Sequence, residues 1–258
     1  MQHIHLGKTG IEVPRLFLGT GSWDFKTGCL QEKVAPQKYA TILKRAFEAQ
    51  INFWDTADDY HIHRHVRLAM EGIPREKLII STKTYGGNAT EALRVLDQSL
   101  SELSTEYMDL YFFHSVDSLD AFERRMNDAL PGLMEAKKNG KIKAIGLSTH
   151  TIHVLEKAVD HPELDVILTN FNKYEIHMDA SIQWYSRCLK RAHKNGKGVL
   201  VMKTIGEGRL RDRAKESIQY NLSQSFIDSV CVGIVTDHDL DQAIEAVGEF
   251  EKHTTPNT

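Results

Sequence analysis

The sequence has few cysteines and no uninterrupted apolar run of membrane-spanning length. Its 3 cysteines, Cys29, Cys188 and Cys231, are widely separated and odd in number, without the spacing of a metal or redox motif. This pattern is typical of free thiols in a reducing compartment. The first residues, Met-Gln-His-Ile-His, lack the charged and then apolar order of a signal peptide. We therefore expect a cytoplasmic, soluble protein that has no membrane contact.

Neither sign of charge is in marked excess. The chain has 32 basic and 35 acidic residues, for a formal net charge of −3, so it lacks the basic surface that binds nucleic acid. Its 258 residues are enough for one barrel of alternating strands and helices, which typically takes about 250 residues. Because no shift in composition marks a linker, we predict a single domain over residues 1–258, with no nucleic acid or membrane partner.

Short apolar runs alternate with segments of helical periodicity along the chain. The predicted strands are 17–21, 52–55, 78–84, 108–114, 142–147, 166–169, 198–203 and 229–233. The predicted helices are 36–49, a short one within 63–71, 90–104, 118–139, 151–159, 178–194, 211–223 and 238–252. Residues 2–14 alternate around Lys8-Thr9-Gly10, which is typical of a hairpin. This order predicts an α/β fold, a (β/α)8 TIM barrel with a parallel sheet.

Three successive predicted strands end in residues that can do chemistry. Asp55 ends the strand 52–55, with Tyr60 on the loop beyond it, Lys83 lies near the end of 78–84, and His114 ends 108–114. Taken singly, each of these residues is more often a cap, a solvated charge or a packed side chain than a catalytic group. Because the carboxyl ends of barrel strands share one face, we expect all four on the face that carries chemistry.

These residues and their neighbours resemble the aldo-keto reductase family. The matching motifs are Asp55-Thr56-Ala57-Asp58-x-Tyr60, Ser81-Thr82-Lys83, Tyr107-Met108-Asp109-Leu110-Tyr111-x-x-His114, Leu6-Gly7-Lys8-Thr9-Gly10 and Gly140-Lys141-Ile142-x-x-Ile145-Gly146-Leu147-Ser148. They follow one another in the order of the family over almost the whole chain. The resemblance implies a hairpin that caps the bottom of the barrel and an enzyme that uses NAD(P)H to reduce a small or polar aldehyde, ketone or sugar carbonyl.

The resemblance also implies a catalytic tetrad of Asp55, Tyr60, Lys83 and His114. Hydride addition builds negative charge on the carbonyl oxygen, so a proton donor has to lie beside it. Tyr60 would be this general acid, with its pKa lowered by the Lys83 ammonium from an ordinary value of about 10. Asp55 would hold Lys83 charged and in place, and His114 would hydrogen-bond and orient the substrate oxygen.

The cofactor contacts implied by the resemblance are less complete than the tetrad. They are Gly19, Thr20, Gly21, Asp55, Ser148, Thr149, Lys203, Thr204, Gly206, Gly233, Thr236 and Gln242. Four positions differ from common family residues: Thr149 and Ala243 replace Asn, Leu168 replaces Gln, and Lys203 or Thr204 stands where an aromatic ring is common. Asp237 would repel a 2′-phosphate. We expect NADP(H) to be favoured over NAD(H), with NAD(H) left open.

Alternatives to a reductase remain. The missing cofactor contacts would also fit a family member that uses the tetrad for redox-neutral chemistry, or a non-catalytic subunit that senses a cofactor or serves as a scaffold. His61, His63 and His65 could chelate a metal in a barrel hydrolase, but no cysteine or carboxylate completes the set, so we expect no metal and a polar edge of the site. The short loops predict an open pocket, or one completed by a partner chain, in a monomer or weak homo-oligomer.

Overall fold

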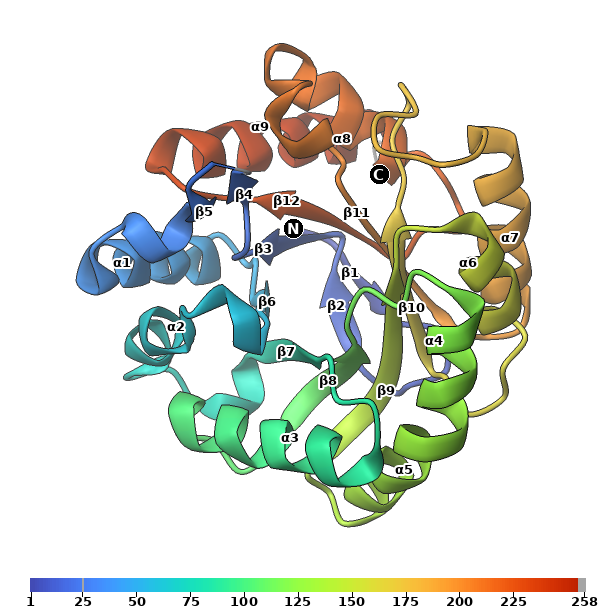
Figure 1. Cartoon of the computed structure of the whole chain (residues 1–258). Helices are drawn as coiled ribbons and strands as arrows, with labels where there is room; N and C mark the ends of the chain where they lie inside the picture. The colour runs from blue at the N-terminus through green and yellow to red at the C-terminus, as the bar shows by residue number, and fades with distance from the viewer. Residues whose placement is uncertain (25, 255–258) are drawn as a thin grey trace.

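Eight parallel strands close into a barrel in the computed structural model, which describes residues 1–24 and 26–254 (Figure 1). Each barrel strand pairs with the next along the chain, and the last pairs with the first, Val230 lying opposite Leu16. The barrel strands are β3 (Leu16–Gly19), β6 (Phe53–Asp55), β7 (Ile79–Thr84), β8 (Met108–Phe113), β9 (Ile142–Thr149), β10 (Val166–Asn170), β11 (Gly198–Met202) and β12 (Ser229–Gly233). The predicted (β/α)8 TIM barrel is therefore confirmed.

Helices surround the strands and bury their apolar faces against the sheet (Figure 1). The α-helices are α1 (Pro36–Glu48), α2 (His63–Met70), α3 (Ala89–Leu103), α4 (Leu119–Arg124), α5 (Leu130–Lys138), α6 (Ile152–Ala158), α7 (Ile182–Lys194), α8 (Ala214–Leu222) and α9 (Asp237–Thr254). Short 3-10 turns lie at η1 (Gln31–Lys33), η2 (Asp58–Tyr60), η3 (Arg75–Lys77), η5 (Gly206–Gly208) and η6 (Arg211–Arg213). None of the helices in the described part is long and apolar enough to cross a membrane.

Among the helix boundaries that differ from the prediction, two have clear local reasons. Helix α7 begins at Ile182 rather than 178 because the Ser181 side chain accepts a hydrogen bond from Trp184 N and caps the helix there. The predicted helix 118–139 is divided into α4 and α5 by a π-turn, η4 (Arg125–Ala129). A π-turn has i→i+5 hydrogen bonds, which the 3.6-residue pattern of apolar positions does not reveal.

The N-terminal hairpin, β1 (His3–His5) and β2 (Glu12–Pro14), closes the end of the barrel where the strands begin. Leu6 and Val13 are buried in the apolar cluster that fills the barrel, with Phe17 and Phe53 stacked 4.4 Å apart. A Cβ on Gly7 would lie 2.4 Å from the backbone nitrogen of Gly198, at the start of β11. This tight backbone contact confirms the capping hairpin.

A second hairpin, β4 (Trp23–Asp24) and β5 (Gly28–Cys29), follows the first barrel strand and was not predicted. Its turn is held by the Asp24 carboxylate, which accepts hydrogen bonds from Lys26 N and Thr27 Oγ1. With two residues a strand, it is too short to give an alternating pattern. It brings Trp23 to the face where the barrel strands end. The polar tail after residue 254, which continues the chain beyond α9, lies outside the described residues.

Candidate active site

A buried ion pair joins Asp55 and Lys83, two of the four predicted catalytic residues. Lys83 Nζ donates hydrogen bonds to Asp55 Oδ2 and to the carbonyl oxygen of Thr56, both at 2.7 Å. The other carboxylate oxygen of Asp55 accepts a hydrogen bond from Ser81 Oγ. Strands β6 and β7 are neighbours with Asp55 opposite Ser81, so the parallel register sets these side chains together. Lys83 is only 2% exposed, and its charge is compensated by these oxygens.

Tyr60 lies on η2, directly beyond the strand that carries Asp55. Its ring packs on Gly21, where any Cβ would come within 2.3 Å of the ring, so this position has room only for glycine. Burial, followed by the carboxylates of Asp55 and Asp59, raises the pKa of Tyr60 well above its ordinary value. The expected net lowering of this pKa is therefore wrong, because burial and the two carboxylates move it upward overall. The ammonium is committed to Asp55 and Thr56 and lies over the Tyr60 ring, 4.9 Å from its centroid, and the hydroxyl stays protonated.

His114 lies where β8 ends, with its backbone N–H donating to Thr84 O at 2.8 Å. Its ring meets the edge of Tyr60, with centroids 5.8 Å apart, and packs on Tyr85 at 4.4 Å. Burial, with the nearby charges of Lys83 and His150, lowers the pKa of His114 well below its ordinary value. The imidazole is therefore neutral at physiological pH and has a single N–H group to donate. The structure thus brings all four predicted catalytic residues together.

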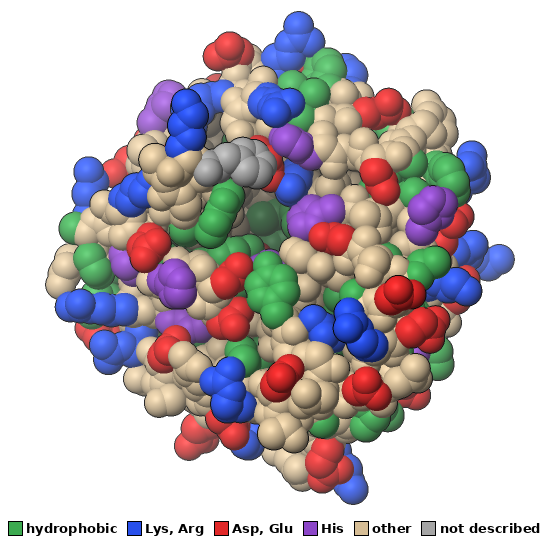
Figure 2. Space-filling view, in the orientation of Figure 1, with side chains coloured by type: hydrophobic (Ala, Val, Ile, Leu, Met, Phe, Trp, Pro, Cys, Tyr) green, Lys and Arg blue, Asp and Glu red, His purple; other side chains and the backbone are tan. Residues whose placement is uncertain are grey.

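These residues open into a cavity of about 430 Å³ on the face where the strands end (Figure 2). Among the expected cofactor contacts, the residues that line it are Gly19, Gly21, Asp55, Ser148, Lys203, Thr204 and Gly233. The expected contacts that are not in the lining are Thr20, Thr149, Gly206, Thr236 and Gln242. Thr20 is turned inward, where its hydroxyl donates to Asp55 O at 2.8 Å, and the Thr149 hydroxyl faces Asp117 at 3.3 Å.

The end of the cavity near Ser148 has few free groups to hold an amide. Ser148 Oγ accepts a hydrogen bond from Ser115 N at 2.9 Å and lies 3.3 Å from Phe113 O, to which it donates. Leu168, where many relatives would have glutamine, is buried in the apolar cluster inside the barrel. The departures noted in the sequence therefore leave this end with fewer polar contacts.

Several cavity residues were not found from the sequence. Trp23 and Tyr85, each 46% exposed, lie at its mouth, and His150 lines it with Nδ1 2.9 Å from Asp117 Oδ2. Tyr85 directly follows the predicted strand 78–84 and His150 directly follows the observed strand β9, so the strand-end rule that found Lys83 and His114 applies to them too. Trp23 depends on the short second hairpin, for which the sequence has no clear signal.

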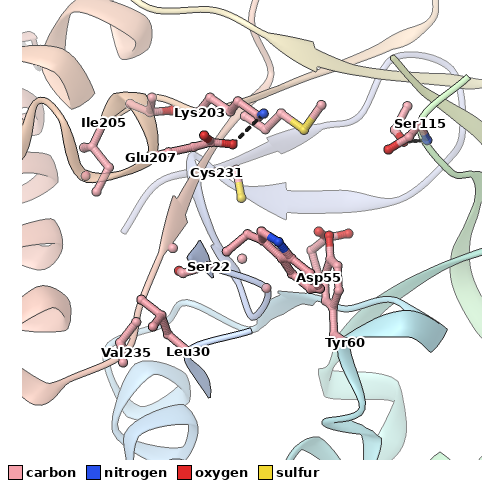
Figure 3. Close-up of a pocket in the computed structure, with 18 of the residues that line it drawn as sticks. Ser22, Leu30, Asp55, Tyr60, Ser115, Lys203, Ile205, Glu207, Cys231 and Val235 are labelled. Carbon is pink, nitrogen blue, oxygen red and sulfur yellow. Dashed lines mark hydrogen bonds and ion pairs between the residues drawn. The ribbon is translucent and has the colours of Figure 1, made fainter. Parts of the chain in front are cut away.

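An ion pair crosses the loop after β11. Lys203 Nζ lies 2.6 Å from Glu207 Oε1, and His177 Nε2 lies 3.0 Å from the other carboxylate oxygen of Glu207 (Figure 3). Lys203 and Glu207 both have positive φ angles, of 54°. Pairing between these two residues depends on this backbone conformation, which residue type alone does not predict.

Val235 lies on the side of the cavity opposite Tyr60 (Figure 3). The carboxylate of Asp239, in the first turn of α9, lines the cavity beside it. Asp239 and Thr236 form a reciprocal cap: Asp239 Oδ2 accepts from Thr236 N at 2.8 Å, and Thr236 Oγ1 accepts from Asp239 N at 3.2 Å. Arg45 of α1 pairs with Asp237 and, at 2.7 Å, with Asp241. The backbone N–H groups of Val235 and Thr236, directly before the helix, thus already donate to the Asp239 carboxylate.

The three histidines after Tyr60 do not converge. His63 Nδ1 lies 2.6 Å from Glu102 Oε2, His65 Nε2 lies 3.0 Å from Val34 O, and His61 is exposed. A metal site built from a pair of these histidines, as in the hydrolase alternative, is therefore wrong.

The comparisons with known proteins agree with one another. The sequence profile of the Aldo/keto reductase family matches residues 16–254. The chain is 28% identical over 163 residues to methylglyoxal reductase DkgA of Salmonella typhimurium, covering 62% of this chain and 54% of that protein. It is 35% identical over 132 residues to methylglyoxal reductase DkgB of the same organism, covering 50% and 49%.

The chain spans about half the length of the curated relatives it matches. A solved structure from Pseudomonas aeruginosa, described as an aldo-keto reductase, superposes with a TM-score of 0.77 at 26% identity, covering 95% of this chain and 96% of that one. The barrel and its capping hairpin, the four side chains gathered at one cavity and the profile match over most of the sequence lead to one conclusion: the chain belongs to the aldo/keto reductase family.

Proposed function

We propose that the protein reduces a small or polar carbonyl compound, an aldehyde, ketone or sugar, with a nicotinamide dinucleotide as hydride donor. Aldo-keto reductases use nicotinamide cofactors. The observation that carries this proposal is the buried Lys83–Asp55 pair beside a protonated Tyr60 and a neutral His114, all lining one cavity.

The bound dinucleotide supplies the hydride, and the side chains supply the proton and the orientation. His114 donates its single imidazole N–H to the carbonyl oxygen and holds the carbonyl in place. The Tyr60 hydroxyl delivers its proton to the same oxygen as negative charge develops there. A raised phenol pKa is compatible with this step because an alkoxide is a stronger base than a phenolate. Lys83, fixed by Asp55, stabilises the phenolate that remains.

The residues of the cavity fit a dinucleotide. Gly19, Gly21 and Gly233 line the cavity, and a Cβ at any of them would collide with a neighbouring side chain. Such bare backbone allows a flat ligand to approach closely. Lys203 and Arg211 also line the cavity and supply the cations that a pyrophosphate requires. Ser148 would contact the carboxamide, with less help than in relatives that have Asn and Gln nearby.

We propose that NAD(H) binds more tightly than NADP(H). The charges at the start of α9 argue against the preference for NADP(H) expected from the sequence. The Asp239 carboxylate already accepts the hydrogen bonds of Val235 N and Thr236 N, which would otherwise bind an anion. A 2′-phosphate would meet this carboxylate, whereas a free ribose hydroxyl could donate a hydrogen bond to it.

Methylglyoxal is the first substrate to test, because it is the compound in the names of the bacterial relatives. It is a small, polar aldehyde with a second carbonyl group. His150 and Ser115, which line the cavity near His114, offer hydrogen bonds to such a second oxygen.

The redox-neutral alternative has one specific observation in its favour. Leu168 and the occupied hydroxyls of Ser148 and Thr149 leave the carboxamide few partners, so the nicotinamide would be held less firmly. In that case the dinucleotide would bind, and the absorbance of its reduced nicotinamide ring would not change during turnover.

The deciding experiment combines binding and turnover. Quenching of tryptophan fluorescence, with Trp23 in the cavity lining as the sensor, measures the dissociation constants of NADH and NADPH. We expect tight binding of NADH, oxidation of NADH with methylglyoxal, and a loss of about 10²–10⁴-fold in kcat in Tyr60→Phe. Cofactor binding should persist in this variant. Failure to bind either cofactor would contradict the proposal.

A further inference from the structure

Asp58, Asp59 and His114 meet beside the proposed catalytic groups with polar atoms that have no partner. Asp58 Oδ1, Asp59 Oδ1 and His114 Nδ1 are each buried, and none has a hydrogen-bond partner within residues 1–24 and 26–254. One ligand atom from each of the three side chains lies within 4.8 Å of the other two. Buried polar atoms in folded proteins are nearly always paired, so three orphans at one point indicate a missing ligand.

The ring of His114 is held firmly and aimed into this cluster. The residue is 7% exposed, and its ring is packed between Tyr60 and Tyr85. If Nε2 carries the single proton, as its role in the proposed function requires, Nδ1 presents a lone pair. That lone pair faces Asp59 Oδ1 at 3.4 Å. Two acceptors facing each other in a buried site repel unless a positive charge lies between them.

The separation of these two atoms suits a metal ion. Two ligands bound at about 2.0–2.1 Å to one tetrahedral ion lie about 3.4 Å apart. His114 Nδ1 and Asp59 Oδ1 are separated by the same distance, 3.4 Å. A shared proton could satisfy these two atoms but would leave the third orphan, Asp58 Oδ1, without a partner.

The local charge favours a divalent cation. Lys83 pairs with Asp55, so the carboxylates of Asp58 and Asp59 add a formal charge of −2 beside His114. Lys83 opposes a cation at this point, but its ammonium is directed to Asp55 and Thr56.

We propose that Asp58, Asp59 and His114 bind a divalent transition-metal cation of the Zn²⁺ class. One imidazole and two carboxylates form a mixed nitrogen and oxygen donor set that such ions accept, with water in the remaining position. An ion on Nδ1 fixes the imidazole proton on Nε2, where it serves as the donor to the substrate oxygen. The proton assignment rests on the proposed function, whereas the orphaned atoms and the charge do not.

Cobalt binding provides the test, since Co²⁺ replaces Zn²⁺ in such sites and its visible absorption reports the coordination geometry of the bound ion. Protein treated with a chelator and then freed of it is titrated with Co²⁺ in the absence of cofactor and substrate. We expect one Co²⁺ per chain, displaced by Zn²⁺. Asp59→Asn and His114→Asn should weaken binding by at least about tenfold, and Asp58→Asn likewise.

Asp117→Asn is the matched control, because it disrupts another histidine–carboxylate pair at the cavity without changing the three ligands. It should bind Co²⁺ as the unmodified protein does. Circular dichroism confirms that each variant is folded. The absence of stoichiometric binding, or equal affinity in all variants, would overturn the inference. Metal binding without NADH binding would instead contradict the proposed function, so the two failures are distinguishable.

Discussion

At the scale of single residues, the feature that costs most to bury is the charged ammonium group of Lys83. It is almost fully buried, and its charge depends on Asp55 and one backbone carbonyl. A buried ion pair adds little stability compared with an apolar pair, but removing one partner leaves the other charge uncompensated. Function therefore explains the pair better than stability does.

Asp55→Asn should lower the free energy of unfolding by about 3 kcal/mol, because Lys83 then keeps its charge without a counterion. The double variant Asp55→Asn/Lys83→Met should regain part of that loss. Ser81→Ala, which removes one hydrogen bond to the same carboxylate, should cost only about 1 kcal/mol. Urea unfolding measures all three. Equal losses in the single and double variants would show that the uncompensated charge is not the cause.

At the scale of elements, one side chain in the first turn of α9, Asp239, both caps the helix and, in the proposed function, selects between NAD(H) and NADP(H). Thr236 was expected to contact the cofactor, and it instead forms the helix cap with Asp239. The sequence Thr-x-x-Asp contains the capping signal, but its acidic residue also lines the cavity.

Changing Asp239 should separate these two roles. Asp239→Asn keeps an oxygen acceptor for the cap and removes the charge, so NADPH affinity should rise relative to NADH by about fivefold, or ~1 kcal/mol. Asp239→Ala also loses the cap, and its free energy of unfolding should fall by about 1 kcal/mol. Asp241→Asn, whose carboxylate pairs with Arg45 outside the cavity lining, should leave the ratio of the two dissociation constants unchanged. Fluorescence titration and urea unfolding measure these effects.

At the scale of the whole molecule, the barrel depends on a closed bottom. The N-terminal hairpin supplies Leu6 and Val13 to the barrel interior and contacts the start of β11 through Gly7. The hairpin lies at the end of the barrel opposite the cavity, so substitutions in it should change stability and leave activity unchanged.

Gly7→Ala should destabilise the protein more than Gly10→Ala. Both residues have positive φ angles, 49° and 76°, so each change carries a backbone cost of about 1–2 kcal/mol. Only at Gly7 would the new Cβ also collide with the β11 backbone, whereas at Gly10 no atom of the described residues lies within 4 Å of that position. Thermal unfolding compares them. Equal shifts of Tm would show that the hairpin yields without strain.

The barrel was predictable because its strands are buried on both faces and appear as apolar runs between amphipathic helices. The gathering of Asp55, Tyr60, Lys83 and His114 at one cavity was predictable for a related reason: strand ends share one face, so residue type at or just beyond those positions is informative. The β4–β5 hairpin, the Lys203–Glu207 pair and the direction of the Tyr60 pKa depend on short turns, backbone angles and burial, which leave no periodic signal. The single domain, the cytoplasmic location and the weak oligomeric state stay predictions.

The π-turn between α4 and α5 has a consequence for chain length. Its i→i+5 bonding accommodates one residue more than a regular helical turn would. Arg125, its first residue, donates a hydrogen bond to the carbonyl oxygen of Tyr85, whose ring packs on His114. Deleting one residue from this turn would restore a regular helix, and it would also rotate α4 about the helix axis relative to α5. The barrel would keep its strands, but Tyr85 would lose the hydrogen bond from Arg125 that holds its backbone. The extra residue in an outer helix therefore contributes to the shape of the site.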